Sequence, residues 1–490
     1  MKQLARLGIG VIGALALLAA FIALRTVTYR AADGPRAASL ELAAPVPVDL
    51  DLAAQHLAEA VRIRTVSHQD PAQNDWSEWE RLRAWLQATY PAVHAATSLE
   101  LVAGHTLVYT WPGTDPARRP IVLMAHHDVV PVTPGTEGDW RHAPFGGVVA
   151  DGAVWGRGAL DNKSSLVALF ESLEGLARSG FVPEATVIVV SGHDEEAGGS
   201  GAAAAAGLLE ARGVRAEFVL DEGLAVVADF PLLGRPVALV GISEKGYGTL
   251  AVTAPAAGGH SFAPPPQTGV ETLARAVLAI TSDPFPMRFE GPTAEMVRTL
   301  APDAGTLVKA AIANEWLFAP LLVRRLAATP VGAATLHTTI APTMLRGSPK
   351  ENVLPQDATA LINYRIAPGH SAAEVMEHAR QATGGLGVTL QWLRPPYEPA
   401  PISSTASRGW QLVAGAAAAG GDWPVAPGLV TATTDSRSMT RVGDDIYRFQ
   451  AIVASMRELR MIHGTDERLT LDNLRRLTEF YSRLVASAAG

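Results

Sequence analysis

Paired acidic side chains after an apolar run are the strongest sign of chemistry in this chain. The run Ala185–Val190 leads through Ser-Gly-His into Asp194, Glu195 and Glu196. Unpaired charges are too costly to bury in a core, so these acids belong at the end of a buried strand, where they can hold cations. Adjacent glutamates allow one carboxylate, Glu196, to ligate a metal while Glu195 handles protons.

A second candidate cluster, His126-His127-Asp128, follows the predicted strand Ile121–Ala125. Because side chains alternate along a strand, His126 and Asp128 fall on one side and His127 on the other. His126 can ligate a metal, and Asp128 can hold its imidazole in the required tautomer. Taken alone, the same pattern also describes a surface histidine beside a turn aspartate.

Asp161 ends a glycine-rich segment and stands just before a predicted helix. One interpretation is an ordinary helix N-cap, a position that aspartate favours. The other is a carboxylate that bridges two metals about 3.5–4 Å apart. The residue type and position leave both open.

Two further candidates complete the set. Asp221 follows the apolar Phe218–Leu220, and His463 lies in the glycine turn of Arg460–Glu467. Together with the clusters above, they place imidazoles and carboxylates on one predicted sheet edge. Such hard-oxygen and imidazole ligands suit two zinc ions, with manganese or cobalt as alternatives.

Composition narrows the classes of function. The chain has 490 residues, a net charge of −8 and no cysteine. The length favours two domains. The acidic balance and the lack of a basic run argue against nucleic acid as a partner. Without cysteine there are no disulfides, thiolate metal sites or cysteine nucleophile, so metal ligands must come from His, Asp and Glu.

The N-terminus contains an apolar segment. Lys2 and Arg6 precede the uncharged stretch Leu7–Leu24, which as a helix is roughly 27 Å long. This length favours a retained single-pass membrane anchor over a cleaved signal peptide. We expect the bulk of the chain outside the cytoplasm, although the flanking charges determine orientation weakly. Residues 25–48, rich in Ala and Pro from residue 31, are predicted to be a tether.

Strands and helices alternate from Asp49 onward, which predicts an α/β domain with a mainly parallel sheet flanked by helices. Ligands of such sheets bind beyond the carboxyl ends of the strands. The pattern changes near Ser243 to a strand–helix–strand–helix–strand set with helical sequence between residues 293 and 326. We therefore expect catalytic parts at 49–243 and 396–490, around an inserted α+β lid or dimerisation-type domain at 244–395.

Seven short motifs follow one another along the chain. They are M-A-H-x-D-V-V-P (124–131), G-R-G-A-x-D (156–161), G-H-D-E-E (192–196), D-E-G (221–223), S-E-K-G (243–246), G-H-S (259–261) and I-H-G (462–464). With these motifs the chain resembles the co-catalytic zinc aminoacylase and carboxypeptidase metallopeptidases, in particular the branch of carboxypeptidase S and the N-fatty-acyl-amino-acid hydrolase/synthase. The resemblance covers about residues 50–485.

The resemblance implies a role for each matching residue. His126 would pair with Asp221 on one metal and His463 with Glu196 on the other, with Asp161 bridging. Glu195 would be the general base and Asp128 would orient His126. His260 of the inserted domain would stabilise the oxyanion, and Arg365 with Asn352 would grip a substrate carboxylate. Asn162 departs from the branch, which usually has Asp after the bridging residue.

Alternatives remain for the residues outside the metal set. His260 fits equally a loop histidine packed beside Pro264–Pro266, and Arg365 a salt-bridged strand residue. Thr434 lies in a loop that the family places at the substrate, and the alternative is a loop in which Asp435 is simply paired with Arg437. The apolar segment Asn314–Val323 suits helix packing or an acyl-chain shelter.

The implied activity is hydrolysis of the amide bond in an N-acyl amino acid or short peptide with a free carboxylate. The reverse reaction would condense a fatty acid with an amino acid. A non-catalytic receptor or scaffold and an aminopeptidase are the rival hypotheses. Because His260 must approach metals in another domain, we expect open and closed states, with a homodimer as an alternative.

Overall fold

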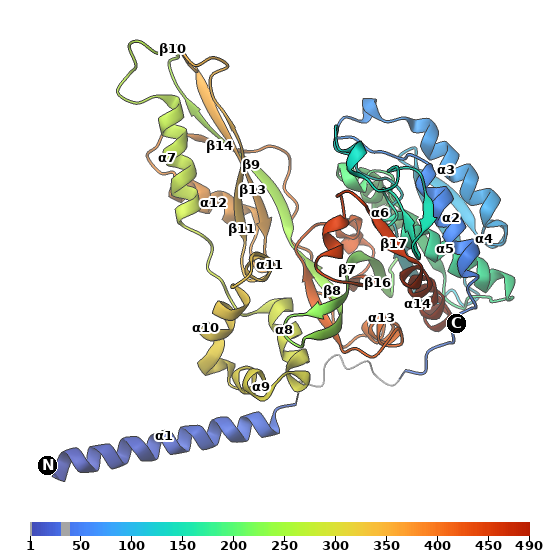
Figure 1. Cartoon of the computed structure of the whole chain (residues 1–490), viewed down its shortest axis with the longest axis horizontal. Helices are drawn as coiled ribbons and strands as arrows, with labels where there is room; N and C mark the ends of the chain where they lie inside the picture. The colour runs from blue at the N-terminus through green and yellow to red at the C-terminus, as the bar shows by residue number, and fades with distance from the viewer. Residues whose placement is uncertain (1, 31–39) are drawn as a thin grey trace.

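A computed structural model of the chain describes residues 2–30 and 40–490, and it has two lobes and a projecting N-terminal helix (Figure 1). The larger lobe is built on an eight-stranded sheet with the order β1-β2-β6-β3-β7-β16-β8-β15. In chain order the strands are β1 (Ser98–Val102), β2 (Thr106–Trp111), β3 (Ile121–Met124), β6 (Val187–Ser191), β7 (Phe218–Phe230), β8 (Arg235–Glu244), β15 (Val425–Val430) and β16 (Ile446–Ala454).

Helices cover both faces of this sheet because its strands are apolar on both sides. On β3, Ile121 and Leu123 pack in the larger core, whereas Val122 and Met124 pack in the smaller one. The helices of the larger core are α2 (Leu50–Arg62), α5 (Lys163–Arg178), α13 (Arg408–Ala418) and α14 (Leu471–Ala489). Helix α6 (Ser200–Ala211) covers the other face, and α3 (Trp76–Thr89) and α4 (Pro91–Ala96) flank the edge.

The sheet is mixed, which corrects the expectation of a mainly parallel one. Strand pairs β3–β6, β3–β7, β7–β16 and β8–β15 are parallel. Pairs β1–β2, β2–β6 and β7–β8 are antiparallel. The physical reason is loop length, since the tight connection between Phe230 and Arg235 permits only an antiparallel hairpin.

The smaller lobe, here called the lid, has a four-stranded antiparallel sheet with the order β11-β13-β9-β14. Its strands are β9 (Gly246–Pro255), β11 (Thr339–Arg346), β13 (Asp357–Ile366) and β14 (Thr389–Trp392), backed by α7 (Gly269–Ser282) and α12 (Ala372–Ala382). The pair β10 (Gly259–His260) and β12 (Val353–Leu354) forms its tip, at the end away from the larger lobe (Figure 1).

Two neighbouring linkers connect the lobes. Strand β8 ends at Glu244 and β9 starts at Gly246. The returning chain pairs with this crossing, since Tyr247 N donates to Tyr397 O at 3.0 Å and Tyr397 N donates to Tyr247 O at 2.8 Å. After α7, and before β11, the chain forms the helices α8 (Gly291–Leu300), α9 (Thr306–Ala313), α10 (Glu315–Leu326) and α11 (Pro330–Ala334). Leu300 of α8 packs with Leu239 and Ala426 of the large sheet, not on the lid sheet.

Helix α1 (Lys2–Thr28) projects from the two lobes beside α9 (Figure 1). Its stretch Ile9–Thr28 is long and apolar enough to cross a membrane, with a mean hydropathy of 2.2, although a signal sequence has the same properties. Residues 31–39 of the predicted tether lie outside the described residues. Its described end packs on α14, where the N–H of Ala43 donates to Ser487 Oγ at 2.9 Å.

Candidate metal centre

Asp161 lies at the centre of a cluster of imidazoles and carboxylates. Its Oδ1 is 3.1 Å from His126 Nε2, and its Oδ2 is 3.2 Å from His463 Nε2. The two oxygens of one carboxylate thus face two different histidines. That arrangement is the one a bridging ligand needs.

A glutamate completes each half of the cluster. Glu222 Oε1 lies 3.1 Å from His126 Nε2, and Glu196 Oε2 lies 3.0 Å from His463 Nε2. Two sets of ligand atoms, His126–Asp161–Glu196 and His126–Glu195–Glu222, each fit within 4.8 Å. The structure therefore brings together His126, Asp161, Glu196 and His463, as the sequence predicted.

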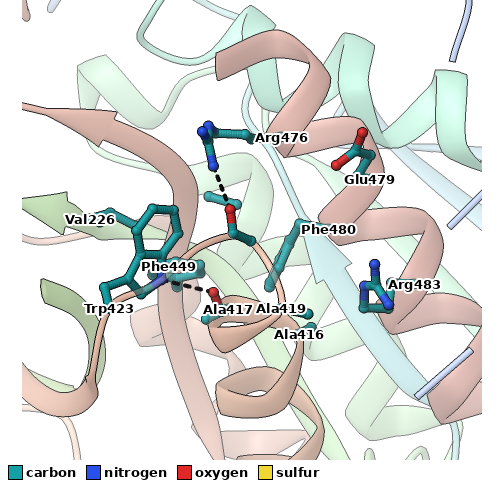
Figure 2. Close-up of a pocket in the computed structure, with 12 residues that line it drawn as sticks. Val226, Ala416, Ala417, Ala419, Trp423, Phe449, Arg476, Glu479, Phe480 and Arg483 are labelled. Atoms are coloured by element: carbon teal, nitrogen blue, oxygen red, sulfur yellow. Dashed lines mark hydrogen bonds between the residues drawn. The ribbon is translucent and has the colours of Figure 1, made fainter. Parts of the chain in front are cut away.

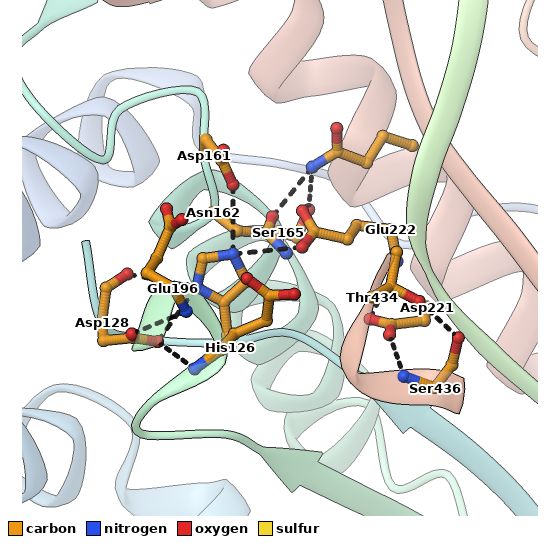
Figure 3. Close-up of polar contacts among 12 residues, drawn as sticks. His126, Asp128, Asp161, Asn162, Ser165, Glu196, Asp221, Glu222, Thr434 and Ser436 are labelled. Carbon is orange, nitrogen blue, oxygen red and sulfur yellow. Dashed lines mark hydrogen bonds and ion pairs between the residues drawn. The ribbon is translucent and has the colours of Figure 1, made fainter. Parts of the chain in front are cut away.

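Asp221 is the exception, and its neighbour Glu222 occupies the place expected for it (Figure 3). The Asp221 carboxylate accepts hydrogen bonds from the backbone N–H of Ser436 at 2.8 Å and of Glu222 at 2.9 Å. The cause is a bulge in β7, where Arg448 of β16 pairs with Asp221 but Phe449 pairs with Leu224. A bulge re-aims side chains, and this one turns Glu222 toward His126.

Asp128 lies against His126, the residue that it was predicted to orient. His126 Nδ1 is 3.1 Å from the backbone oxygen of Asp128 and 3.3 Å from its Oδ1, so that Nε2 faces the cluster. Asp128 is fully buried and also accepts from Ser67 Oγ and from the backbone N–H of Glu195 and Glu196. One carboxylate thus positions both the histidine and the glutamate pair.

A buried ion pair between Arg157 and Glu467, which the sequence did not reveal, supports the half of the cluster that contains His463. Glu467 Oε1 accepts from the backbone N–H of Gly158, Leu160 and Asp161 at 2.9, 2.9 and 3.1 Å. Arg157 pairs with Glu467 and also donates to the carbonyl of His463. The only signal for it was the position of Glu467 four residues after His463.

Charge in the cluster indicates that it is built for cations. Four carboxylates and two imidazoles share a largely buried space, and burial raises the pKa of Glu222 to about 8. Hydrogen bonds to Asp161 and Glu196 raise the pKa of His463 to about 10. Divalent cations would remove the repulsion among the carboxylates, and the nitrogen and oxygen ligands suit zinc, manganese or cobalt.

Glu195 faces a cleft between the lobes. The cleft has a volume of about 330 Å³ and is lined by Glu195 and Glu196 on one side and by Tyr247, Thr249 and Tyr397 on the other. Arg437 also lines it, 4.0 Å from Glu195 and with its guanidinium 4.7 Å from the ring centre of Tyr397. Burial raises the pKa of Glu195 well above its usual value. A carboxylate that binds protons strongly is suited to accept one from water.

A second cavity lies beneath α13 and α14, between Trp423, Phe449 and Arg476 (Figure 2). Its volume is about 20 Å³, which is room for one water molecule. Trp423 Nε1 donates to Ala417 O at 3.0 Å, and Arg476 donates to Gly420 O. The interlobe cleft is therefore the better candidate for a substrate.

The remaining predicted residues lie outside the metal cluster. His260 is exposed at the lid tip beside Asn352, whose carbonyl accepts from Ser261 N at 3.1 Å. Arg365 stacks 4.8 Å from the ring centre of Tyr247, and its NH1 atom is buried without a hydrogen-bond partner among the described residues. Thr434 is buried, and its hydroxyl donates to Glu244 at 2.9 Å.

Cation ligands beside a carboxylate placed to move protons define a metal-dependent hydrolase. A profile of Peptidase family M20/M25/M40 matches residues 122–487, and the chain belongs to that family. It is 35% identical over 446 residues to "Probable carboxypeptidase S-like 2" of Dictyostelium discoideum, which covers 89% of this chain and 85% of that protein. It is 32% identical to human "N-fatty-acyl-amino acid synthase/hydrolase PM20D1", over 96% of this chain and 95% of that one.

Solved structures share the fold at low sequence identity. A metallo-carboxypeptidase of Sulfolobus solfataricus aligns with a TM-score of 0.64 and 16% identity, over 89% of this chain and 99% of that one. Human carnosine dipeptidase 1 aligns with a TM-score of 0.61 and 15% identity, over 90% and 97%. The α/β fold and the resemblance drawn from the motifs are thereby confirmed.

Proposed function

We propose that the chain hydrolyses the amide bond of N-acyl amino acids, or of short peptides with a free carboxylate, at a centre of two zinc ions. The observation that carries this proposal is the placement of Asp161 between His126 and His463, at 3.1 and 3.2 Å. A shared carboxylate with a histidine on each side is suited to two metals, not one. The names of its relatives support acyl amino acids as substrates and a reversible reaction.

The residues divide into two ligand sets around Asp161. His126 with Glu222 would hold one ion and His463 with Glu196 the other, so Glu222 replaces Asp221 in our assignment. Divalent zinc supplies a Lewis acid and lowers the pKa of water toward neutrality. Glu195 takes the proton from water and passes it to the leaving amine.

Substrate binding involves the lid. The NH1 atom of Arg365 is buried beside Tyr247 without a protein partner in the described chain, which leaves the guanidinium free to bind a carboxylate. His260 and Asn352 lie together at the lid tip. We propose that they complete the site either by lid closure or from the lid of a second copy.

An N-terminal anchor is the second part of the proposal. The segment Ile9–Thr28 is 20 residues long, about 30 Å as a helix, which matches the hydrocarbon core of a bilayer. The large side chains of α1 are mostly exposed, including Leu15 and Leu17. We propose a single-pass protein with its catalytic lobe outside the cytoplasm.

The test compares Glu195→Gln with wild type, and uses Glu210→Gln as the matched surface control, since the Glu210 side chain on α6 is half exposed. Substrates are N-acyl amino acids of several chain lengths, each with a free or an amidated carboxylate. We expect Glu195→Gln to keep its zinc and to lose turnover by about 10²–10⁴-fold. Wild-type protein that holds zinc but hydrolyses none of these amides would overturn the proposal.

A further inference from the structure

Helices α9 and α10 expose large apolar side chains. Leu307 is 86% exposed, Trp316 and Leu321 are each 56% exposed, and Leu317 is 41% exposed. Leu317 and Leu321 are one helical turn apart on the same face of α10, and Trp316 directly precedes Leu317 on that helix. Large apolar side chains gathered on the outside of a protein mark an interaction site. We call these four residues the α9–α10 face.

This face continues directly from α1. The ring of Phe21 packs edge-on against Trp316 with 6.3 Å between centroids. Arg25 Nε donates to the carbonyl of Ala313 at 2.9 Å. The side-chain amide of Asn314 donates to the carbonyl of Ile22 at 3.4 Å. The last turns of α1 are therefore fixed to the junction of α9 and α10, and the two apolar surfaces meet.

The contact between Phe21 and Trp316 determines how deep Trp316 lies in a bilayer that α1 spans. If Ile9–Thr28 spans a bilayer, then Phe21 lies seven residues before the end of the span, about 10 Å into it. Trp316 contacts Phe21 and must lie at a similar level. Helices that lie in a membrane interface bury their apolar faces about 5–10 Å into it.

Charges around the face fit a lipid surface. Lys309 lies on α9, and Arg324 and Arg325 end α10. The acid of α10, Glu315, is paired with Arg298 at 2.9 Å. Apolar side chains with tryptophan, bordered by basic residues, are typical of contact with anionic phospholipid headgroups.

We propose that the α9–α10 face inserts into the phospholipid leaflet beside α1, so that the lid-side helices as well as the anchor are bound to the membrane. The inference rests on the proposed anchor. It goes beyond anchoring, because it assigns a second membrane contact and fixes how the two lobes stand on the bilayer.

The experiment uses the full chain, which has no cysteine, so that each introduced cysteine is the only labelling site. Leu321→Cys tests the face, Leu15→Cys reports on α1, and Leu278→Cys is the control at an exposed position of α7. Each variant is labelled with the fluorophore NBD and reconstituted into liposomes of phosphatidylcholine and phosphatidylglycerol, with or without nitroxide-labelled acyl chains.

We expect the nitroxide lipid to quench most of the emission at positions 15 and 321 and little at position 278. Quenching at 15 but not at 321 would overturn the membrane contact of the face and leave the anchor intact. Lack of quenching at both positions would overturn the anchor as well. A shielded but unquenched label at 321 would identify a second copy of the chain as the occupant and would also overturn the inference.

Discussion

Arg157 and Glu467 form a fully buried ion pair, with 2.5 Å between NH1 and Oε2. Through it, the loop that ends in Asp161 is tied to the turn that presents His463, because Glu467 binds the loop amides and Arg157 binds the His463 carbonyl. Both side chains act on the backbone of cluster residues, Glu467 on the N–H of Asp161 and Arg157 on the carbonyl of His463. The pair therefore sets the distance between the bridging carboxylate and one of its histidines.

Replacing Glu467 tests this positioning role. Glu467→Gln keeps the shape but leaves the Arg157 charge unpaired in the interior, which we expect to lower stability by about 3 kcal/mol. Zinc affinity should fall by about 10–100-fold, as is usual when a residue that supports metal ligands is lost. Equilibrium dialysis against zinc, with Glu210→Gln as the surface control, measures the second effect. Unchanged zinc affinity in a folded variant would contradict the role.

The two neighbouring acids of β7 give a sharper test of the ligand assignment. We expect Glu222→Gln to lose one of two zinc ions, because it removes the carboxylate beside His126. Asp221→Asn should keep both, because an amide oxygen can still accept the hydrogen bond from Ser436 N. Zinc per chain, measured by elemental analysis, distinguishes them. The reverse pattern would restore Asp221 as the ligand.

This pair also shows where sequence reasoning reached its limit. Residue types and positions make His126, Asp161, Glu196 and His463 candidates, and the family resemblance assigns them as metal ligands. The choice between Asp221 and Glu222 depended on a bulge, which arises from the pairing of β7 with β16, more than 200 residues away. The local sequence pattern around Asp221 contains no information on the register in which β7 pairs with β16.

The prediction of the fold has the same limit: elements set by local sequence could be predicted, and pairings between distant segments could not. The strand expected at Ile121–Ala125 and the helix expected just after Asp161 are present as β3 and α5, because periodicity is a local property. The sheet was expected to be mainly parallel because strands and helices alternate in the sequence, but β7 and β8 follow each other without a helix and form a hairpin. Packing of α8 against the large sheet likewise depends on contacts between distant segments.

His260 is expected to act without ligating metal. His260→Ala should keep its zinc and lower kcat by about 10²–10³-fold, the usual loss of an oxyanion partner. Lys350→Ala, at an exposed position in the same tip, serves as control. Mixing the His260→Ala and Glu195→Gln variants distinguishes closure of a chain's own lid from contribution of the lid by a second copy. Activity can recover only if His260 of one chain acts at the metal centre of another. An unchanged kcat in His260→Ala would exclude the role.

Lys245 lies at the crossing between the lobes, and we expect it to make the free energy of unfolding depend on pH. Burial lowers its pKa to about 7 from its usual 10.5, and Nζ donates to the carbonyls of Ala334 and His337. Between these values the unfolded chain binds one more proton than the folded chain. The unfolding free energy contributed by Lys245 therefore rises with pH, by about 1.4 kcal/mol per unit.

Lys245→Met removes this slope. Relative to the variant, wild type should gain on the order of 2 kcal/mol between pH 7.5 and 9.5, measured from urea midpoints. Lys350→Met, at an exposed position, should leave the wild-type slope in place. Parallel curves for wild type and Lys245→Met would show that Lys245 keeps an ordinary pKa.

The central claim is that Asp161 bridges two metal ions. Anomalous diffraction at the zinc edge, from crystals of the zinc-loaded chain, tests it most directly. We expect two peaks about 3.5–4 Å apart, one between Asp161, His126 and Glu222 and one between Asp161, His463 and Glu196. A single peak, or two peaks that do not share Asp161, would contradict it.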